Sequence, residues 1–431
     1  MNVIESKNKI KFVDYRDEYA NLVSFNNNKN LSVHRWYPFV EGYSAEFVKR
    51  IIGEQKYIPD NCLEPFGGIG TTALACQDLN VKCHSVEINP FFYDVTKAKL
   101  SNFDSKKFEN DILIFTSFLK KCKSIPKIPI LESKTFFEND DRSKWIFDLS
   151  VTYGISDILE QIKKIKAEGN ENHILFKIAL ANLLVPSSNV FRNGKCMSFR
   201  KDWKNKNITR EEFHENFIGF CKNVLLVDIR SRENMINTVY NSSTCYNGDS
   251  RKVVGNINEK FDLIITSPPY LNSRDYTDVY RLELWILGYI DKFVDERKLR
   301  KSTLTSHVQV PLPETDYPDI QEINSFLLHL NNLDGGLWNK NIPNMFKGYF
   351  NDMDLLIKEF YNKLNVGGKA YINVSNSSYG NKICEVDLIL AKIAEMNNLE
   401  VEEIRIARNI GTSSQQNVKF PVRESVIVLR K

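Results

Sequence analysis

The sequence predicts an α/β fold in which a long helical insert interrupts a mostly parallel sheet. Short apolar runs alternate with helical periodicity at about residues 44–101, and the same pattern resumes at residue 261. Between these blocks, apolar residues recur every three or four positions, as in amphipathic helices. A chain of 431 residues suits two or three domains. We therefore divide it into residues 1–101, a mainly helical insert at 102–240, and residues 241–431 with a loop-rich insert at about 297–348.

The individual elements follow from the same patterns. In the first block we expect helices at 44–53, 71–79 and 91–101 and strands at 61–65 and 82–87. In the insert we expect helices at 155–167, 172–184 and 210–231. In the last block we expect strands at 261–266, 369–374, 401–407 and 424–429, and helices at 281–294, 353–364 and 385–397.

A glycine-rich turn joins the strand at 61–65 to the helix that follows it. Gly67, Gly68 and Gly70 allow positive φ and let a ligand approach the backbone closely. The start of the helix, at Thr71 and Thr72, offers free N–H groups. The Gly-Gly-x-Gly spacing is not the full dinucleotide fingerprint, so a tight βα connection remains the structural alternative.

Two acids follow at positions where nucleotide-binding units place them. Glu87 ends the next strand, near the offset of roughly 20 residues at which a carboxylate meets ribose hydroxyls. Asp249, in the turn Asn247-Gly248-Asp249, could accept a hydrogen bond from an adenine amino group. The alternatives are a solvated acid at a strand end and ordinary turn chemistry.

The most informative segment is Ser267-Pro268-Pro269-Tyr270, which ends the apolar run at 261–266. In open α/β sheets, ligands bind at the carboxyl ends of parallel strands. The two prolines stiffen the backbone there, and they would hold the Ser267 hydroxyl and the Pro268 carbonyl beside the Tyr270 ring. Two acceptors next to an aromatic face suit a planar base with an exocyclic amine. The alternative is a proline-rich turn after a core strand.

These segments resemble the S-adenosylmethionine-dependent DNA amino-methyltransferases. Residues 64–72 are similar to the family's cofactor loop, and residues 266–270 are similar to its catalytic loop. The resemblance implies a Rossmann-like methyltransferase sheet with a closing antiparallel hairpin, S-adenosyl-L-methionine as cofactor, and catalysis by Ser267, Pro268, Pro269 and Tyr270. The cofactor-binding residues that it implies are Glu64, Phe66, Gly67, Gly68, Gly70, Thr71 and Thr72, with Glu87 at the ribose, Asp249 at the adenine, and Trp36 and Tyr37 from a more loosely similar motif at 34–39.

The residue before the two prolines indicates the target base. Within the family, serine there is usual for N4-cytosine enzymes, and asparagine or aspartate is usual for N6-adenine enzymes. We therefore expect methylation of the N4 atom of a flipped cytosine in double-stranded DNA, in a restriction–modification system with a cognate endonuclease as genetic partner. The alternatives are an N6-adenine enzyme, an RNA methyltransferase, a nucleotide-binding oxidoreductase that does not methylate, and an inert DNA-binding protein.

The net charge is only +4, so any nucleic-acid contact must be local. The insert contains a run in which basic and aromatic side chains alternate, which suits phosphate contact with stacking. The alternative is a solvated loop. The expected DNA-binding residues are Arg192, Lys195, Arg200, Lys201, Trp203 and Lys204 in this run, and Arg274 and Tyr276 beside the catalytic segment.

The eight cysteines show no Cys-x-x-Cys spacing, so we expect reduced thiols and no metal. No run approaches ~18 consecutive apolar residues, and residues 1–7 carry no apolar leader. We therefore expect a soluble, cytoplasmic protein without a membrane partner.

Overall fold

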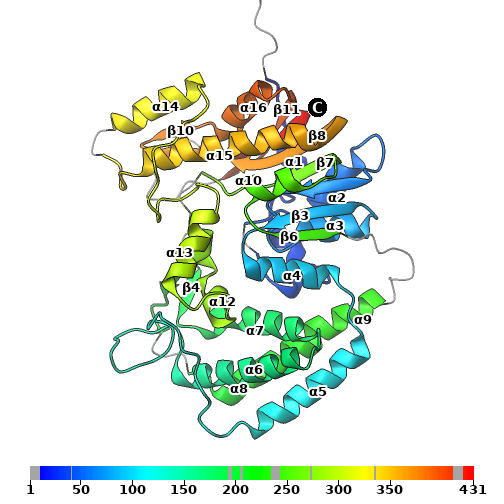
Figure 1. The fold of residues 1–431 in the computed structure, drawn as a ribbon, viewed down its shortest axis with the longest axis vertical. Helices are drawn as coiled ribbons and strands as arrows, with labels where there is room; N and C mark the ends of the chain where they lie inside the picture. The colour runs from blue at the N-terminus through cyan, green and yellow to red at the C-terminus, as the bar shows by residue number, and fades with distance from the viewer. Residues whose placement is uncertain are drawn as a thin grey trace, which may run out of the picture.

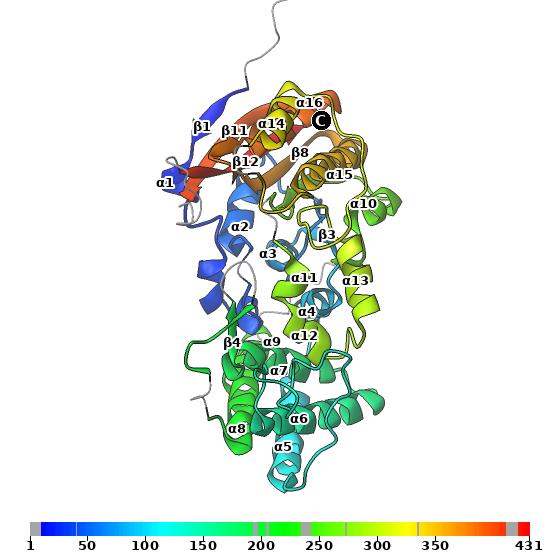
Figure 2. The same ribbon diagram turned by 90° about the vertical axis from the view of Figure 1, so that its left-hand side faces the viewer.

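The computed structural model describes residues 10–39, 41–192, 197–203, 207–233, 243–271, 274–333, 336–410 and 421–431. The sheet and its covering helices form one end of the molecule, and a bundle of helices forms the other end (Figure 1). Figure 2 shows the same two-part arrangement from the side. No described helix combines the length and the hydropathy that crossing a membrane would require.

The described strands form a main sheet of eight, in the order β1-β11-β12-β8-β7-β2-β3-β6. Neighbouring strands are parallel except at β12, which runs antiparallel to both β8 and β11. The predicted Rossmann-like sheet, mostly parallel with an antiparallel C-terminal hairpin, is therefore confirmed. The strands are β1 (Phe12–Asp14), β2 (Asn61–Glu64), β3 (Lys82–Glu87), β6 (Thr244–Asn247), β7 (Phe261–Thr266), β8 (Leu364–Ser375), β11 (Glu400–Ile410) and β12 (Val422–Arg430).

Three helices flank the first strands, close to where the sequence predicts them. They are α2 (Ala45–Gly53), α3 (Thr71–Asp78) and α4 (Pro90–Leu100). The Ser44 side chain caps α2 by accepting from the Phe47 N–H, and Asn89 caps α4, whose first residue is Pro90. Helix α3 is buried from Thr71 to Gln77, and its Ala73, Ala75 and Cys76 side chains belong to the apolar core that it shares with α2 and the sheet.

The helices between residues 105 and 233 pack around one apolar core. They are α5 (Ser105–Lys121), α6 (Leu149–Ala167), α7 (His173–Ser187), α8 (Arg210–Phe220) and α9 (Val227–Glu233). The sequence predicts one helix at 210–231, whereas the structure has α8 and α9 joined by a π-helical turn at Cys221–Leu226. It also adds α5, whose apolar stripe went unrecognised. A small hairpin of β4 (Val190–Arg192) and β5 (Met197–Phe199) follows α7.

The region after the catalytic segment differs from the predicted pattern. The single helix expected at 281–294 is two helices, α12 (Arg281–Ile286) and α13 (Phe293–Ser302), because Gly288 adopts φ of 76° just after α12. The stretch expected to be loop-rich contains α14 (Gln321–Asn331) and the first two turns of α15 (Ile342–Lys363). Both helices bury apolar faces in the core beside the sheet. The remaining elements are α1 (Arg16–Tyr19), α10 (Ser250–Val253), α11 (Tyr276–Val279), the hairpin of β9 (Ser377–Tyr379) and β10 (Lys382–Cys384), and α16 (Val386–Met396).

Candidate active site

The carboxyl ends of three adjacent strands meet at one edge of the sheet. The glycine turn follows β2, Glu87 ends β3, and Ser267 follows β7. Together they line one cavity of about 1180 Å³. The predicted site residues in its wall are Glu64, Phe66, Gly67, Gly68, Thr71, Thr72, Glu87, Asp249, Ser267, Pro268, Pro269, Tyr270, Arg274 and Tyr276. The fold thus brings the predicted cofactor loop and the predicted catalytic loop to one hollow.

The glycine turn adopts a backbone that requires glycine. Gly68 and Gly70 have φ of 52° and 81°, in the left-handed region. A Cβ on Gly70 would also lie 2.7 Å from Thr96 Cγ2. The Gly67 N–H donates to the Val86 carbonyl at 2.9 Å, which ties the turn to β3. The turn therefore presents bare backbone to the cavity.

Glu64 is buried at the base of this turn and accepts four hydrogen bonds. Thr266 Oγ1 and the Phe66 N–H donate to Oε1 at 2.7 and 2.9 Å. Thr72 Oγ1 donates to Oε2 at 2.8 Å, and the Tyr43 hydroxyl donates to the same oxygen. Burial raises the pKa of the Glu64 carboxyl to about 7, and the four donors only partly offset this effect. No local sequence pattern marks Tyr43 as part of the site, yet it lies in the cavity wall.

Replacing Glu64 with glutamine should change how stability depends on pH. Because its pKa is about 7 in the folded chain and its ordinary value is 4.5, the folded state keeps a proton that the unfolded state releases. The free energy of unfolding should therefore fall as pH rises from 4.5 to 7, by about 3 kcal/mol for this one group. Urea unfolding across that window should show this slope in the parent chain and lose it in Glu64→Gln. An equal slope in both proteins would contradict the assignment, and Glu400→Gln, an exposed acid, serves as control.

Glu87 closes the same cavity from β3. Its two oxygens accept from the Gly68 N–H and the Asn89 N–H, both at 2.7 Å. These bonds fix the carboxylate against the glycine turn and leave further lone pairs for a ligand's hydroxyl groups. Burial raises the pKa of Glu87 to about 7. Asp249 lies in the same wall, where it is paired with Arg251 at 2.9 Å.

Glu87→Ala should weaken S-adenosylmethionine binding by about 10- to 100-fold. Hydrogen bonds to a charged group contribute about 1.5–3 kcal/mol, and the variant would lose those that the resemblance implies between Glu87 and the ribose hydroxyls. Isothermal calorimetry on the parent and the variant measures this directly. Glu400→Ala, which removes an exposed acid on β11, should bind like the parent. Unchanged affinity in Glu87→Ala would remove Glu87 from the cofactor site.

Hydrogen bonds with side chains on β8 and β12 hold the segment Ser267–Tyr270 in place. The Tyr270 hydroxyl donates to Glu424 Oε1 at 2.6 Å and accepts from Asn373 Nδ2 at 2.9 Å. The Ser267 hydroxyl donates to the Tyr270 oxygen at 3.3 Å. Arg408 donates to the other oxygen of Glu424 at 2.5 Å. Glu424 and Arg408 both line the cavity. Sequence reasoning missed these partners because no local pattern marks them.

Three predicted cofactor residues, Gly70, Trp36 and Tyr37, are not among the residues of the cavity wall. Trp36 and Tyr37 are almost fully buried in the core, and the Trp36 ring N–H donates to Asp228 at 3.1 Å. Tyr37 packs edge-on against Phe91. The structure corrects this part of the expected cofactor site, because the segment turns these two rings away from the cavity. Phe39, from the same segment, lies in the cavity wall instead.

Two residues that were predicted to contact DNA, Arg192 and Trp203, instead make their contacts inside the protein. Arg192 pairs with the buried Glu283 at 2.7 Å and lies over the Tyr280 ring. Trp203 is 8% exposed and packs edge-on against Trp145. The structure therefore corrects both predictions, since neither side chain is presented to solvent as a DNA contact would be.

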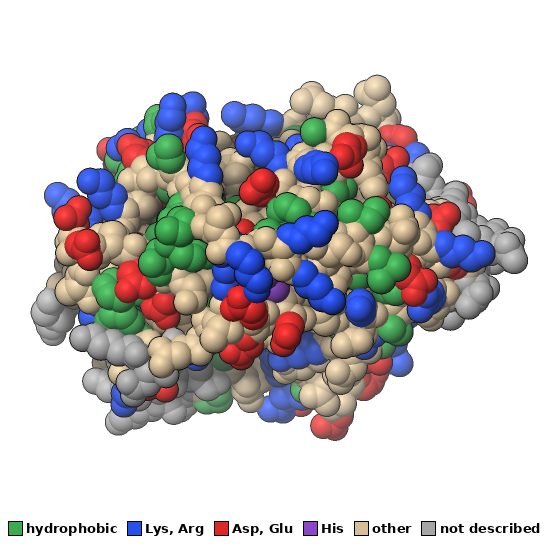
Figure 3. Space-filling view, turned by 90° about the horizontal axis from the view of Figure 1, so that it is seen from below, with side chains coloured by type: hydrophobic (Ala, Val, Ile, Leu, Met, Phe, Trp, Pro, Cys, Tyr) green, Lys and Arg blue, Asp and Glu red, His purple; other side chains and the backbone are tan. Residues whose placement is uncertain are grey.

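The other basic residues of the run have different positions. Lys201 is exposed and Arg200 is half-buried, whereas Lys195 and Lys204 lie outside the described residues. Arg274, in the cavity wall, pairs with Glu41 at 2.8 Å. On the face of the helical end seen in Figure 3, Lys and Arg side chains are interspersed with Asp and Glu. The coloured part of that face therefore shows no purely basic patch.

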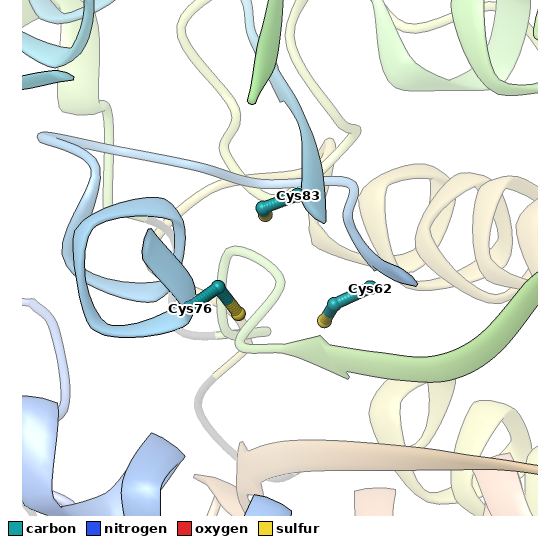
Figure 4. A group of neighbouring side chains, drawn as sticks. All are labelled: Cys62, Cys76 and Cys83. Atoms are coloured by element: carbon teal, nitrogen blue, oxygen red, sulfur yellow. The ribbon is translucent and has the colours of Figure 1, made fainter. Parts of the chain in front are cut away.

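The side chains of three cysteines from neighbouring elements converge (Figure 4). Cys62 on β2, Cys76 on α3 and Cys83 on β3 place their sulfur atoms within 4.8 Å of one another. All three side chains are buried in the apolar core between α2, α3 and the sheet. Burial raises the pKa of the Cys62 thiol well above its usual value. The three thiols belong to this core, where buried cysteine packs as a small apolar side chain.

The cavity fits the cofactor that the sequence predicts. The backbone of Gly67 and Gly68 lies in the cavity wall without side chains, and Glu87 offers acceptors at the edge of the sheet that open α/β folds use for nucleotides. Fold and site define a methyltransferase whose methyl donor is S-adenosylmethionine.

Comparison with known proteins confirms that the protein is a methyltransferase and relates it to the type II methyltransferases. No protein-family model matches the chain. The chain is 27% identical over 444 residues to the type II methyltransferase M.AvaI of Nostoc sp. (strain PCC 7120) and to that of Anabaena variabilis, covering 95% of this chain and 89% of each relative. It is 25% identical over 483 residues to the type II methyltransferase M.BsoBI of Geobacillus stearothermophilus, covering 95% of this chain and 88% of the relative. The chain is thus related to the type II methyltransferases, and the predicted resemblance is confirmed.

Similarity to solved structures is slight. TrmN of Thermus thermophilus superposes with a TM-score of 0.29 at 9% identity, over 90% of this chain and 48% of TrmN. The rRNA methyltransferase aviRa of Streptomyces viridochromogenes also gives 0.29 at 9% identity, over 94% of this chain and 92% of that protein.

Proposed function

We propose that the protein is a site-specific DNA methyltransferase that transfers a methyl group to the exocyclic N4 atom of a flipped cytosine in double-stranded DNA. The observation that carries the proposal is that the Ser267-Pro268-Pro269-Tyr270 corner and the glycine turn share one cavity. The relationship to type II methyltransferases supports DNA as the substrate and a role in restriction–modification, with a cognate endonuclease as genetic partner.

The chemistry requires positioning more than activation by the protein. S-adenosylmethionine supplies a methyl group that is activated by its sulfonium. The chain must hold the amine nitrogen in line with that methyl and exclude water, an effect that can supply several kcal/mol. The Ser267 hydroxyl oxygen and the Pro268 carbonyl would accept the two amine hydrogens. This draws the nitrogen toward a tetrahedral shape and exposes its lone pair, while the Tyr270 ring stacks on the base.

The target base must leave the duplex to reach this corner, which costs a few kcal/mol. Residues at the open side of the cavity are candidates for holding the DNA around it. Tyr276 lies in the wall, and Trp338, which is 67% exposed, lies at the same cavity. We assign residues 102–240 as the candidate region for sequence recognition, with Arg200 and Lys201 as its candidate DNA contacts among the described residues.

N6-adenine methylation is the second candidate function. The same two acceptors would bind an adenine amine, so the geometry suits both bases, and Ser267 before the two prolines is what favours cytosine. RNA methylation would use the same corner. An oxidoreductase would give the catalytic segment no role.

Mass spectrometry of nucleosides from DNA incubated with the protein and S-adenosylmethionine tests the proposal. The expected product is N4-methyldeoxycytidine. If the product is instead N6-methyldeoxyadenosine, the target base is adenine and not cytosine. Methylation confined to an RNA substrate would overturn the DNA assignment. No methylated nucleoside in either, from protein that binds the cofactor, would overturn the proposal as a whole.

A further inference from the structure

A chain of hydrogen bonds runs from the C-terminal hairpin to the catalytic serine. Arg408 Nε, on β11, donates to Glu424 Oε2 at 2.5 Å. Tyr270 Oη donates to Glu424 Oε1, on β12, at 2.6 Å, and Ser267 Oγ donates to Tyr270 Oη at 3.3 Å. Asn373 Nδ2, on β8, donates to both Tyr270 Oη and Glu424 Oε1, at 2.9 and 3.1 Å. Glu424 is 1% exposed, so water does not compete for these bonds.

The chemistry of the groups sets the direction of this chain. A guanidinium only donates, and a carboxylate only accepts. The single proton of the Tyr270 hydroxyl is therefore directed to Glu424, and the Tyr270 oxygen can only accept from its other neighbours. The Ser267 proton is in turn directed to Tyr270. Both lone pairs of Ser267 Oγ then remain for an incoming hydrogen-bond donor.

We infer that Glu424 is a positioning residue for methyl transfer, which acts through Tyr270 to keep Ser267 an acceptor for the target amine. This inference rests on the proposed function, since it assumes that an amine is bound at Ser267. Glu424 lies more than 150 positions after Tyr270 in the sequence, so the inference extends the site beyond the local segment that contains Ser267. Glu424 itself is turned toward Tyr270 and Arg408, and it acts on Ser267 only through the phenol.

Glu424→Gln should reverse the direction of the chain while nearly preserving its shape. Because Arg408 only donates, the amide oxygen of the new side chain must face Arg408, which turns the amide NH2 toward Tyr270. Tyr270 then accepts from that NH2 and from Asn373, and its own proton points to Ser267. Ser267 Oγ then accepts a hydrogen bond from Tyr270. That bond occupies one of the two lone pairs that the parent protein leaves for the target amine.

A double-mutant cycle with Tyr270→Phe tests the inference. In the parent background, Glu424→Gln should lower kcat for methyl transfer by about 10- to 100-fold, while the Kd of S-adenosylmethionine and the KM for DNA change less than about twofold. Tyr270→Phe keeps the ring but removes the hydroxyl that transmits the effect. In that background, Glu424→Gln should change kcat by less than about twofold.

The outcomes separate the inference from its alternatives. If Glu424 only supports the fold, Glu424→Gln should lower kcat by the same factor in both backgrounds, and that result would overturn the inference. Unchanged kcat in Glu424→Gln alone would also overturn it, while leaving the proposed function intact. Failure of the proposed function is recognised separately, because the parent protein would then methylate no DNA.

A second variant covers the case in which Glu424→Gln does not fold. Arg408→Gln combined with Glu424→Gln removes the guanidinium that fixes the amide, so the amide oxygen can turn back toward Tyr270. The double variant should therefore regain at least about tenfold in kcat over Glu424→Gln, or approach the parent if the single variant is insoluble. A folded double variant that binds cofactor but shows no methyl transfer would contradict the proposed direction of the chain.

Discussion

Replacing Ser267 with alanine is expected to lower the rate of methyl transfer about a hundredfold. Removing one preorganised hydrogen-bond partner from an active site typically costs about 100- to 1000-fold in kcat. In the proposed function the lost group is one of two acceptors for the target amine, and the Pro268 carbonyl remains. Single-turnover transfer of a labelled methyl group to DNA measures the chemical step apart from product release.

The control for this variant comes from the same cavity. The Ser302 hydroxyl, also in the wall, donates to the Lys298 carbonyl of its own helix at 3.0 Å, so Ser302→Ala should methylate like the parent. Cofactor affinity should be unchanged in both variants, because neither serine belongs to the glycine turn or to β3, where the cofactor is expected to bind. A Ser267→Ala enzyme that methylates at the parent rate would exclude the hydroxyl from the mechanism.

Arg192→Ala is expected to lower the free energy of unfolding by about 3–5 kcal/mol. Its guanidinium is the partner of Glu283, whose side chain is fully buried, and it also donates to the Val279 carbonyl at 3.0 Å. Removing one member of a buried pair leaves an uncompensated charge, which is the costly way to break such a pair. Urea unfolding followed by circular dichroism measures the loss.

Lys201→Ala is the matched control, because Lys201 is an exposed cation of the same basic run. Its substitution should alter stability by no more than about 0.5 kcal/mol. If Arg192 were instead a phosphate contact, Arg192→Ala would leave stability unchanged and would reduce the salt dependence of DNA binding. That pattern would contradict the interior role that the geometry assigns to Arg192.

The parts of the site that the sequence predicts well are those built from neighbouring residues. Strand β7 ends where its apolar run meets Pro268, because proline cannot continue the ladder. The glycine turn is equally local, since Gly68 and Gly70 adopt positive φ directly after β2. Placing both at one cavity required only the rule that ligands bind at the carboxyl ends of parallel strands.

The parts that escaped prediction depend on long-range contacts. Tyr43, Asn373 and Glu424 come from three separate elements, and nothing in the residues beside them marks a contact with the site. Trp36 was misassigned for the same reason, since its partner Asp228 lies far along the chain. The basic run suggested DNA contacts, but a charge run does not reveal which of its members, like Arg192, have a buried partner.

Secondary structure failed where glycine or tertiary packing decided the outcome. Gly288 ends a helix whose apolar periodicity continues beyond it. Helix α14 and the first two turns of α15 were hidden by asparagine, proline and glycine in the segments around them, and both are stabilised by burial against the sheet. Gly367 and Gly368, which lie between the helix expected at 353–364 and the strand expected at 369–374, belong to β8.

The central position of β12 has a consequence for how the enzyme matures. This strand inserts between β8 and β11, and it is the last strand of the sheet to emerge during synthesis. A nascent chain that already contains the glycine turn and Ser267 still lacks the partner of Tyr270. Pairings of such high sequence separation form slowly. Newly made protein should therefore be able to bind its nucleotide-like donor before it can transfer the methyl group, which becomes possible only when β12 has been made and has paired.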